Sequence, residues 1–150
     1  MRLDHLVIPV FRADAALDFY SQTLGLPLVD AFGGEDWEGY PWLMMVFGLA
    51  DGRHLVLVAL KGADNPGRGD IPEDSRHYAF SVEAGELDAW RTRLTAAGVA
   101  FREEQHGPSN SLYFSDPDGT VLEIAAPPSH TPFGPPDPQA LARAKAWIAG

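Results

Sequence analysis

The sequence predicts an α+β protein built from two similar strand–helix–strand–strand–strand (βαβββ) modules, and three observations carry this prediction. A strand-like segment followed by an amphipathic helix occurs near the start of the chain and again after its middle. The two copies are in register, because the offset from His5 to His77 differs by one residue from the offset between Gly25 and Gly98. An Asp-Pro-Asp-Gly hairpin turn at residues 116–119 closes the second copy. A repeat of this length indicates two modules that face each other.

Composition and charge narrow the class of protein. With 150 residues, 45% hydrophobic and 21% charged, the chain suits one soluble domain with a hydrophobic core. Acidic residues outnumber basic ones 21 to 11, and the net charge of −10 excludes nucleic acid as a partner, because phosphate binding needs a basic face. The absence of cysteine excludes thiolate metal ligands, disulfides and a cysteine nucleophile.

The chain carries no segment typical of membranes or secretion. No apolar run approaches the roughly 18 to 20 residues that cross a bilayer, so we expect no membrane partner. The first strand-like segment starts at Leu3, so no signal peptide is expected either. We therefore predict a cytoplasmic protein.

Module one is predicted to span residues 1–61. Its helix has apolar residues at helical spacing and is ended by Gly25, a typical C-cap. An Asp-Gly pair at residues 51–52 signals a hairpin. The expected elements are a strand at 3–10, a helix at 13–24 and strands at 27–32, 40–47 and 54–60. Residues 62–75, rich in Gly, Pro and Asp, are expected to link the two modules.

Module two is predicted to span residues 76–126. A strand at 76–82 and a helix at 85–97, ended by Gly98, repeat the start of module one. Strict alternation around the Asp-Pro-Asp-Gly turn then predicts a hairpin with one bulky face and one smaller, more polar face. The polar face carries Tyr113 and Glu123. A buried glutamate needs a cation or a metal beside it, so Glu123 is a candidate site residue.

The tail, residues 127–150, is expected to be an arm followed by a helix. Six prolines favour an extended conformation over residues 127–138. Asp137 and Pro138 fit the N-cap and first positions of a final helix. Its apolar side, expected to dock on its own domain or on a second subunit, comprises Leu141, Ala144, Trp147 and Ile148.

Three polar residues occupy comparable strand positions: His5, His77 and Glu123. Each has small or modest neighbours on its own face of the strand, whereas bulky residues lie on the opposite face, where helices can cover them. Two neutral imidazoles and one carboxylate suit a divalent metal such as Fe(II), Mn(II), Ni(II) or Zn(II), with positions left open for substrate. The alternative is two unrelated core histidines and a glutamate paired with an arginine.

The chain resembles the vicinal oxygen chelate superfamily, which joins glyoxalase I, fosfomycin-resistance proteins, bleomycin-resistance proteins and extradiol dioxygenases. The resemblance covers about residues 3–126. It is carried by Leu-Asp-His-Leu at 3–6, Leu-Asp-Phe-Tyr at 17–20 with Leu-Gly at 24–25, Arg-His-Tyr-Ala-Phe at 76–80, and Leu-Tyr-Phe-Ser-Asp-Pro-Asp-Gly at 112–119 through Glu123. It implies paired βαβββ modules closing into a cup-like mixed sheet around a metal held by His5, His77 and Glu123. The strand at 54–60 lacks the acid that supplies a fourth ligand in glyoxalase I, which favours the three-ligand members.

The extradiol dioxygenases are the preferred comparison. Their pattern is matched by His106, Leu112, Tyr113, Asp116, Pro117, Gly119 and Glu123. The segment Gly-Arg-His-Leu at 52–55 also resembles the stretch that supplies their acid–base histidine. The resemblance implies an Fe(II) enzyme acting on a small catechol-like substrate, in which His54 moves protons and His106 and Tyr113 hydrogen-bond the substrate oxygens.

Other functions remain open on the same residues. One is a lyase or isomerase, or a fosfomycin-type thiol transferase, although residues 106–111 offer no Lys or Arg to a phosphonate. Another is a metal-free protein that sequesters a flat ligand, as bleomycin-resistance proteins do. We expect a homodimer. An aromatic segment is expected to divide between the core and an apolar wall for the substrate: Trp37, Tyr40, Trp42, Met44, Met45 and Phe47.

Overall fold

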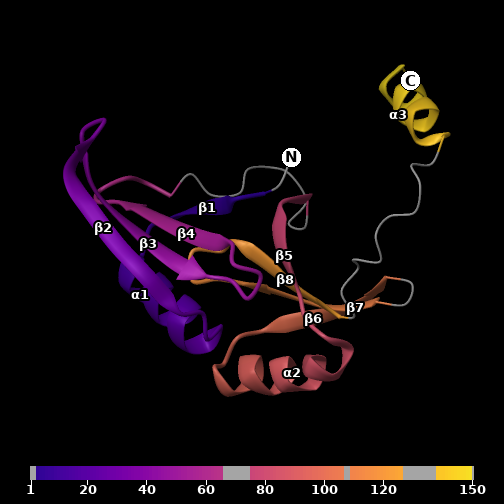
Figure 1. Ribbon diagram of the computed structural model, residues 1–150, viewed down its shortest axis with the longest axis horizontal. Coiled ribbons are helices and arrows are strands. Elements are labelled where there is room, and N and C mark those ends of the chain that lie inside the picture. The colour runs from indigo at the N-terminus through magenta and orange to yellow at the C-terminus, as the bar shows by residue number, and fades with distance from the viewer. Residues whose placement is uncertain (1–2, 66–74, 107–108, 127–137, 150) are drawn as a thin grey trace.

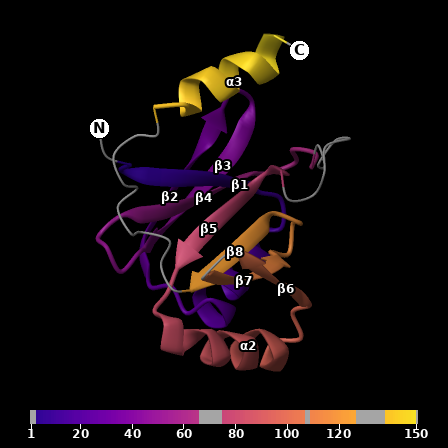
Figure 2. The same cartoon turned by 90° about the vertical axis from the view of Figure 1, so that its right-hand side faces the viewer.

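The computed structural model describes residues 3–65, 75–106, 109–126 and 138–149. Two four-stranded mixed sheets dominate these residues, and one principal helix lies beside each sheet (Figures 1 and 2). The strand orders are β1-β4-β3-β2 and β5-β8-β7-β6. In each sheet the first strand pairs in parallel with the last, and the remaining neighbours are antiparallel. The predicted α+β class and the repeated βαβββ unit are therefore confirmed.

The first sheet and its helix follow the predicted order. The elements are β1 (His5–Val10), α1 (Ala13–Asp18), the π-helical turn η1 (Phe19–Thr23), β2 (Leu28–Trp37), β3 (Tyr40–Gly48) and β4 (His54–Leu60). The helix starts at Ala13 as expected, but its second half widens to π geometry, which the apolar spacing does not distinguish from α. Gly25 follows with φ of +71°, the left-handed conformation that ends a helix. β2 runs five residues beyond the predicted strand.

The second sheet repeats this plan. Its elements are β5 (His77–Ser81), the 3₁₀ turn η3 (Ala84–Glu86), α2 (Leu87–Ala96), β6 (Phe101–His106), β7 (Ser109–Ser115) and β8 (Val121–Ala126). A capping box starts the helical segment, in which the Glu83 N–H donates to Glu86 Oε2 at 2.8 Å. α2 buries Leu87 and Leu94 against the sheet. The turn before β8 places Gly119 at φ of +89°, as the hairpin signal predicts.

The two sheets share one hydrophobic core. Buried residues from both helices and both sheets form a single cluster, including Ile8 and Tyr20 from the first module and Leu112 and Leu122 from the second. Because side chains alternate along a strand, each sheet turns one face toward this core and the other face away from it. We call the outward faces the cup face of the first sheet and the cup face of the second sheet.

The Asp-Pro-Asp-Gly turn joins the two modules. Asp116 Oδ2 accepts a hydrogen bond from the Tyr20 hydroxyl at 3.0 Å, and both residues are buried. Asp118 accepts bonds from the backbone N–H groups of Phe11 and Arg12 and from Arg12 Nε. Through these hydrogen bonds the turn predicted from the sequence also fixes the start of α1 and the η1 turn of the other module. We call this set of contacts the clasp.

The last helix does not pack on its own domain, the first of the two alternatives expected from the sequence. α3 (Ala140–Ala149) forms, but every described residue from 138 to 149 is exposed, with Trp147 at 85% and Ile148 at 76%. Figure 1 shows α3 standing apart from both sheets. The docked helix expected on its own domain is therefore absent from the single chain, and Asp137, its expected N-cap, lies outside the described residues. Among the described residues, every helix is too short or too polar to span a bilayer.

Candidate metal centre

His77 and Glu123 meet on the cup face of the second sheet. β5 and β8 are parallel neighbours in which His77 pairs with Val121 and Ala79 with Glu123, so the two side chains project from the same face. His77 Nε2 lies 3.0 Å from Glu123 Oε2. The Glu123 side chain is 9% exposed and that of His77 is 32% exposed. A nearly buried carboxylate is thus paired with a nitrogen that is also a good metal ligand.

Tyr113 extends this pair toward β6. It lies directly across from Glu123 on β7 and is buried, and its ring meets the His77 ring edge-on with centroids 5.5 Å apart. The guanidinium carbon of Arg102 lies 4.5 Å from the centre of the Tyr113 ring on the side of β6. Arg102 also forms an ion pair with Glu104. A phenol and a cation therefore accompany the two candidate ligands.

Arg102 is a candidate site residue that the sequence analysis missed. The search for a basic residue looked at the loop near residues 106–111, whereas Arg102 lies earlier on β6, in register with Tyr113. Alternation along residues 101–106 would have placed Arg102 and Glu104 on the face of Tyr113, but only if the pairing of that strand with β7 were known.

His5 lies at one end of the cup face of the first sheet. It is half-exposed, and its Nδ1 is 2.7 Å from Asp4 Oδ1. This hydrogen bond, together with the charge of the imidazole, holds the pKa of Asp4 below its usual range. His54 is the in-register neighbour of His5 on β4 and shares its face. When Nδ1 of His5 donates to Asp4, Nε2 is left as an acceptor that can ligate a metal.

The three predicted ligands do not converge within one chain. Among the described residues, no group of three or more His, Asp or Glu side chains is placed to hold a metal ion. His5 lies on the first sheet, whereas His77 and Glu123 lie on the second. His77 and Glu123 form one half of a site, and His5 with His54 forms another.

His77 and Glu123 carry atoms of the types that bind divalent metals, but two protein ligands are too few for a complete site. An imidazole nitrogen and a carboxylate oxygen already lie within hydrogen-bond distance of each other, and both atom types suit Fe(II), Mn(II), Ni(II) or Zn(II). A third protein ligand must come from outside this pair. His106 ends β6 opposite Ser109, and its side chain lies outside the described residues, so its catalytic role remains a prediction.

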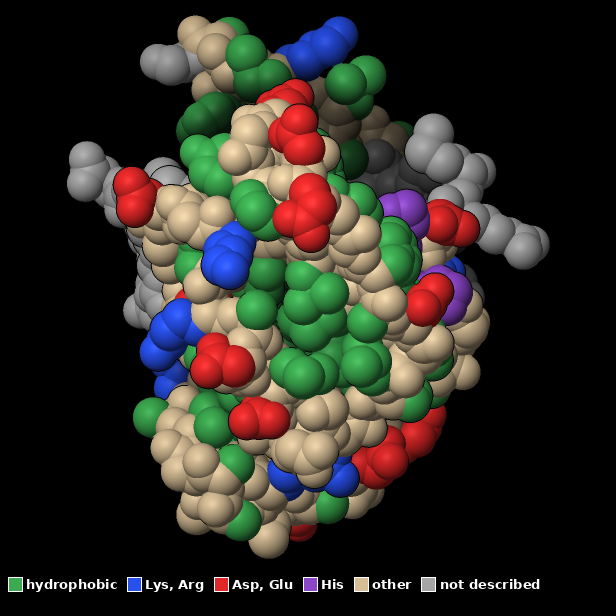
Figure 3. Space-filling view, turned by 90° about the vertical axis from the view of Figure 1, so that its left-hand side faces the viewer, with side chains coloured by type: hydrophobic (Ala, Val, Ile, Leu, Met, Phe, Trp, Pro, Cys, Tyr) green, Lys and Arg blue, Asp and Glu red, His purple; other side chains and the backbone are tan. Residues whose placement is uncertain are grey.

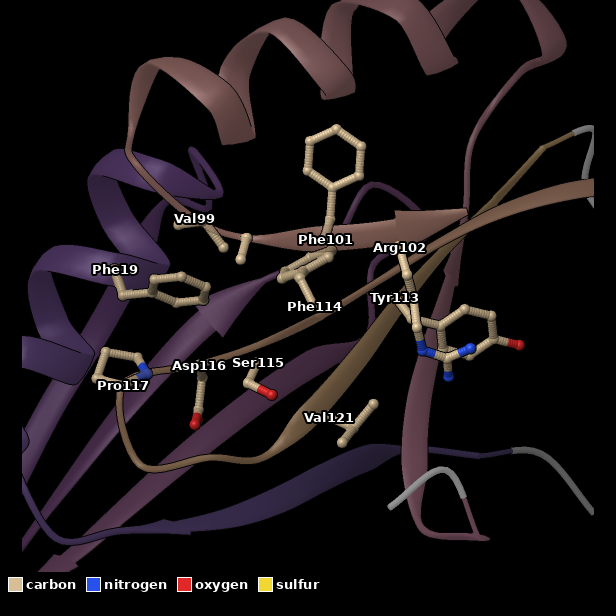
Figure 4. Close-up of a pocket in the computed structure, with 11 residues that line it drawn as sticks. Phe19, Val99, Phe101, Arg102, Tyr113, Phe114, Ser115, Asp116, Pro117 and Val121 are labelled. Carbon is tan, nitrogen blue, oxygen red and sulfur yellow. The ribbon is translucent and has the colours of Figure 1, made fainter. Parts of the chain in front are cut away.

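A cavity opens beside Tyr113 and Arg102. It has a volume of about 530 Å³ and includes Ser115 and Val121 from the cup face and Phe19 and Val99 from the module junction (Figure 4). Figure 4 shows the Arg102 and Tyr113 side chains side by side, pointing away from the Phe101 ring. The cavity is large enough for a small ligand and combines apolar walls with a cation and a hydroxyl.

The aromatic segment divides as the sequence analysis expected. Met45 and Phe47 are core residues with almost no exposure. Trp42 and Met44 pair with Leu60 and Val58, and they fall on the cup face because Val58 pairs with Pro9 in the row of His5. This cup face is therefore apolar over most of its length, with histidines at one end.

Comparison with known proteins finds similarity both to a metallothiol transferase and to a catechol dioxygenase. Residues 2–124 match the family model described as Glyoxalase/Bleomycin resistance protein/Dioxygenase superfamily. Metallothiol transferase FosB of Shouchella clausii is 31% identical over 127 residues, covering 81% of this chain and 77% of that protein. Catechol-2,3-dioxygenase of Bacillus subtilis is 34% identical over 82 residues, 51% of this chain and 28% of that protein. The fosfomycin resistance protein FosX of Listeria monocytogenes, crystallised with Mn(II) and sulfate, superposes with a TM-score of 0.64 at 20% identity, covering 83% of this chain and 91% of that one.

Proposed function

Because the chain belongs to the Glyoxalase/Bleomycin resistance protein/Dioxygenase superfamily, we propose that it is a metal-dependent enzyme that works as a homodimer. The observation that carries this proposal is the contact between His77 Nε2 and Glu123 Oε2, a nearly buried pair of metal-binding atoms with no third ligand in reach among the described residues. His5 of a second copy completes the set when the cup face of its first sheet covers the second sheet of this copy.

Exposed apolar surface supports the same arrangement. The cup face of the first sheet leaves Val7, two residues from His5, 44% exposed in the single chain. Such a surface is costly in water and is expected to be buried in an interface. Covering it with a second copy brings His5 toward His77 and Glu123 without any change in the fold of either chain.

The residues around this centre have separable roles. A divalent cation held by His77, Glu123 and the partner's His5 would supply a Lewis acid. Asp4 holds His5 through Nδ1 and so presents Nε2 to the site. Tyr113 offers a hydroxyl, Arg102 a positive charge, and the cavity beside them has apolar walls.

The reaction we favour is extradiol-type cleavage of a small catechol-like substrate, with Fe(II) as the metal. His54 supports it, because this titratable side chain lies beside His5 on the same face and is free of the ligand set. The apolar cup face formed by Val56, Val58 and Met44 suits an aromatic ring. In this reaction the ring C–C bond beside the diol breaks, both atoms of O2 are incorporated into the ring-opened product, and His54 would move a proton.

Thiol transfer to a small anionic substrate is the second candidate, with Mn(II), Ni(II) or Zn(II) as alternatives to iron. Two observations favour it. Arg102 over Tyr113 supplies a cation that the loop at 106–111 lacks, and the FosB relative is matched over 77% of its length. A glyoxalase-like lyase or isomerase would use the same residues. The remaining alternative is a protein that is not an enzyme and that sequesters a ligand without a metal.

Subunit complementation tests the shared metal site. Each single variant, His5→Ala or Glu123→Ala, breaks both sites of its homodimer. A purified heterodimer of the two variants has one intact site, because the His5→Ala copy keeps His77 and Glu123 while the other copy keeps His5. We expect metal content near zero for each homodimer and one metal ion for the heterodimer. Equal loss in all three samples would show that ligands are not shared between chains.

Activity assays on the metal-loaded parent then separate the reactions. Anaerobic protein loaded with Fe(II) is expected to consume O2 with a catechol and to give a yellow ring-opened product. Activity with a thiol and an epoxide under Mn(II), Ni(II) or Zn(II), without O2 uptake on any catechol, would assign the transferase instead. Failure to take up metal after reconstitution would favour the ligand-sequestering protein.

A further inference from the structure

The C-terminal helix carries a binding surface that the single chain does not use. At 100° per residue, the large apolar side chains of α3 and two of its alanines fall within one stripe: Ala140, Leu141, Ala144, Trp147 and Ile148. Arg143 and Lys145 flank the stripe on its two sides, and residues 138–149 contain no acid. The helix is thus apolar and basic, although the whole chain has a net charge of −10. An exposed tryptophan and isoleucine on a short helix indicate an unfilled contact.

A second exposed apolar surface, with acidic instead of basic residues near it, lies at the tip of the β2–β3 hairpin. Phe32 and Trp37 meet Trp42 edge-on, with ring centroids 6.0 Å and 5.7 Å apart, and both Phe32 and Trp37 are exposed. The contact depends on Gly34, where a Cβ would stand 2.7 Å from Trp42 Nε1. We call Phe32, Trp37 and Trp42 the tip cluster.

The hairpin that carries the tip cluster is rich in acidic side chains. The hairpin from residue 28 to residue 48 contains Asp30, Glu35, Asp36 and Glu38 and no Lys or Arg. All four acids are exposed. Figure 3 shows apolar side chains gathered on this side of the molecule with acidic ones beside them. The hairpin is therefore apolar and acidic, the complement of α3.

We propose that α3 of one copy docks on the tip cluster of the other copy, with Trp147 and Ile148 against the aromatic rings and Arg143 and Lys145 beside the hairpin acids. This inference rests on the proposed dimer. The tail leaves the second sheet at Ala126, three residues after Glu123, and Glu123 faces the first sheet of the partner copy in that dimer. The tail therefore starts opposite the partner's first sheet, the sheet that carries the tip cluster.

A helix docked on the tip cluster would lie outside the metal centre. Trp42 pairs with Leu60, at the end of β4, whereas His54 begins that strand and neighbours His5. The six residue steps from His54 to Leu60 correspond to about 20 Å at about 3.3 Å per residue. α3 would close the far end of the cup and leave the ligands untouched.

Cysteine cross-linking tests the contact directly, because the chain has no cysteine of its own. Two differently tagged copies, one with Glu35→Cys and one with Ala149→Cys, are co-expressed, purified through both tags and treated with a short bismaleimide. We expect a covalent dimer as the main product. A matched control with Thr95→Cys, on the exposed side of α2, in place of Glu35→Cys should give several-fold less product. Trp147→Ala with Ile148→Ala, or Arg143→Glu with Lys145→Glu, should lower the yield by a similar factor.

The remaining outcomes overturn the inference in distinguishable ways. Cross-linking within one chain of a Glu35→Cys/Ala149→Cys double variant, at high dilution, would make the chain's own hairpin the occupant. Binding of the protein to anionic phospholipid vesicles through Trp147, without a cross-link, would show that α3 docks on a lipid surface instead. A metal-loaded dimer without any cross-link refutes only the helix contact, whereas a metal-free monomer by light scattering also refutes the proposed function.

Discussion

Glu123 shows how one residue links stability to function. A carboxylate with a side chain only 9% exposed is costly unless a charge or strong donor accompanies it, and His77 Nε2 at 3.0 Å fills that role. The same two atoms are the ligands we propose for the metal.

Replacing either member should remove metal affinity and leave the fold in place. Substitutions outside the ligand shell already cost about 10- to 100-fold in affinity in other metal sites, so His77→Ala and Glu123→Gln should cost at least that much. Metal titration and thermal melts measure the two effects. Ser81→Ala, on the same face of β5, is the control and should bind like the parent. Parent-like affinity in either ligand variant would remove that residue from the site.

His54 should affect rate and not metal binding. Its side chain is exposed at the start of β4, so His54→Ala has little packing to lose. A group that moves a proton contributes about 10²- to 10⁴-fold, and turnover should fall by that order while metal content stays at the parent level. Tyr113→Phe should be milder, because the ring contact with His77 is kept. Unchanged turnover in His54→Ala would exclude it as the acid–base group.

At the scale of elements, the clasp between η1 and the β7–β8 turn holds the two modules together. Asp116 accepts three bonds, from the Tyr20 hydroxyl and from the backbone N–H groups of Asp118 and Thr120. Tyr20→Phe removes one buried hydrogen bond and keeps the ring, so the free energy of unfolding should fall by about 1–2 kcal/mol. Urea unfolding measures this change, with Tyr40→Phe on the exposed hairpin as control. Equal midpoints for the two variants would show that the clasp adds nothing.

The same carboxyl gives a pH dependence with a defined sign. Burial raises the pKa of Asp116 above its ordinary value of 3.8, and the hydrogen bonds from Thr120 and Tyr20 oppose this shift only in part. Folding therefore favours the protonated form, and the stabilisation is fullest below 3.8 and is lost as the pH rises through the folded pKa. The advantage of the parent over Asp116→Asn should shrink as the pH rises from 3.8 through the folded-state pKa of Asp116 in unfolding titrations. An advantage that grows over this range would contradict the assignment.

At the scale of the whole molecule, the first sheet exposes a surface that a second copy is expected to cover. Val7→Glu places a charge in the middle of that interface, where its desolvation is costly. The variant should be monomeric by light scattering and should lose its metal, since His5 no longer reaches a partner. Thr95→Glu on the exposed side of α2 controls for added charge. A dimeric, metal-loaded Val7→Glu protein would place the interface elsewhere.

The sequence by itself determined the repeat, the strands and the faces on which candidate residues lie. These are local properties: period-2 alternation put Tyr113 and Glu123 on one face of the predicted hairpin, and Gly25, Gly98 and Gly119 were predicted at positions where φ is positive. The same locality explains why residues 116–119 could be predicted as a turn. Their second role, accepting bonds from Tyr20 and Arg12, depends on contacts between residues about a hundred positions apart.

Only the tertiary structure decided which faces meet. Alternation assigns a residue to a face, but the packing of the two sheets on one core decides whether two faces converge, and here it separates His5 from His77 and Glu123. Arg102 lies beside Tyr113 only because β6 pairs with β7. Helical spacing likewise gave α3 an apolar stripe, but a stripe does not specify its partner, and within the single chain Trp147 stays exposed. Burial is a property of what packs against a surface, and a one-dimensional pattern records only that a surface exists.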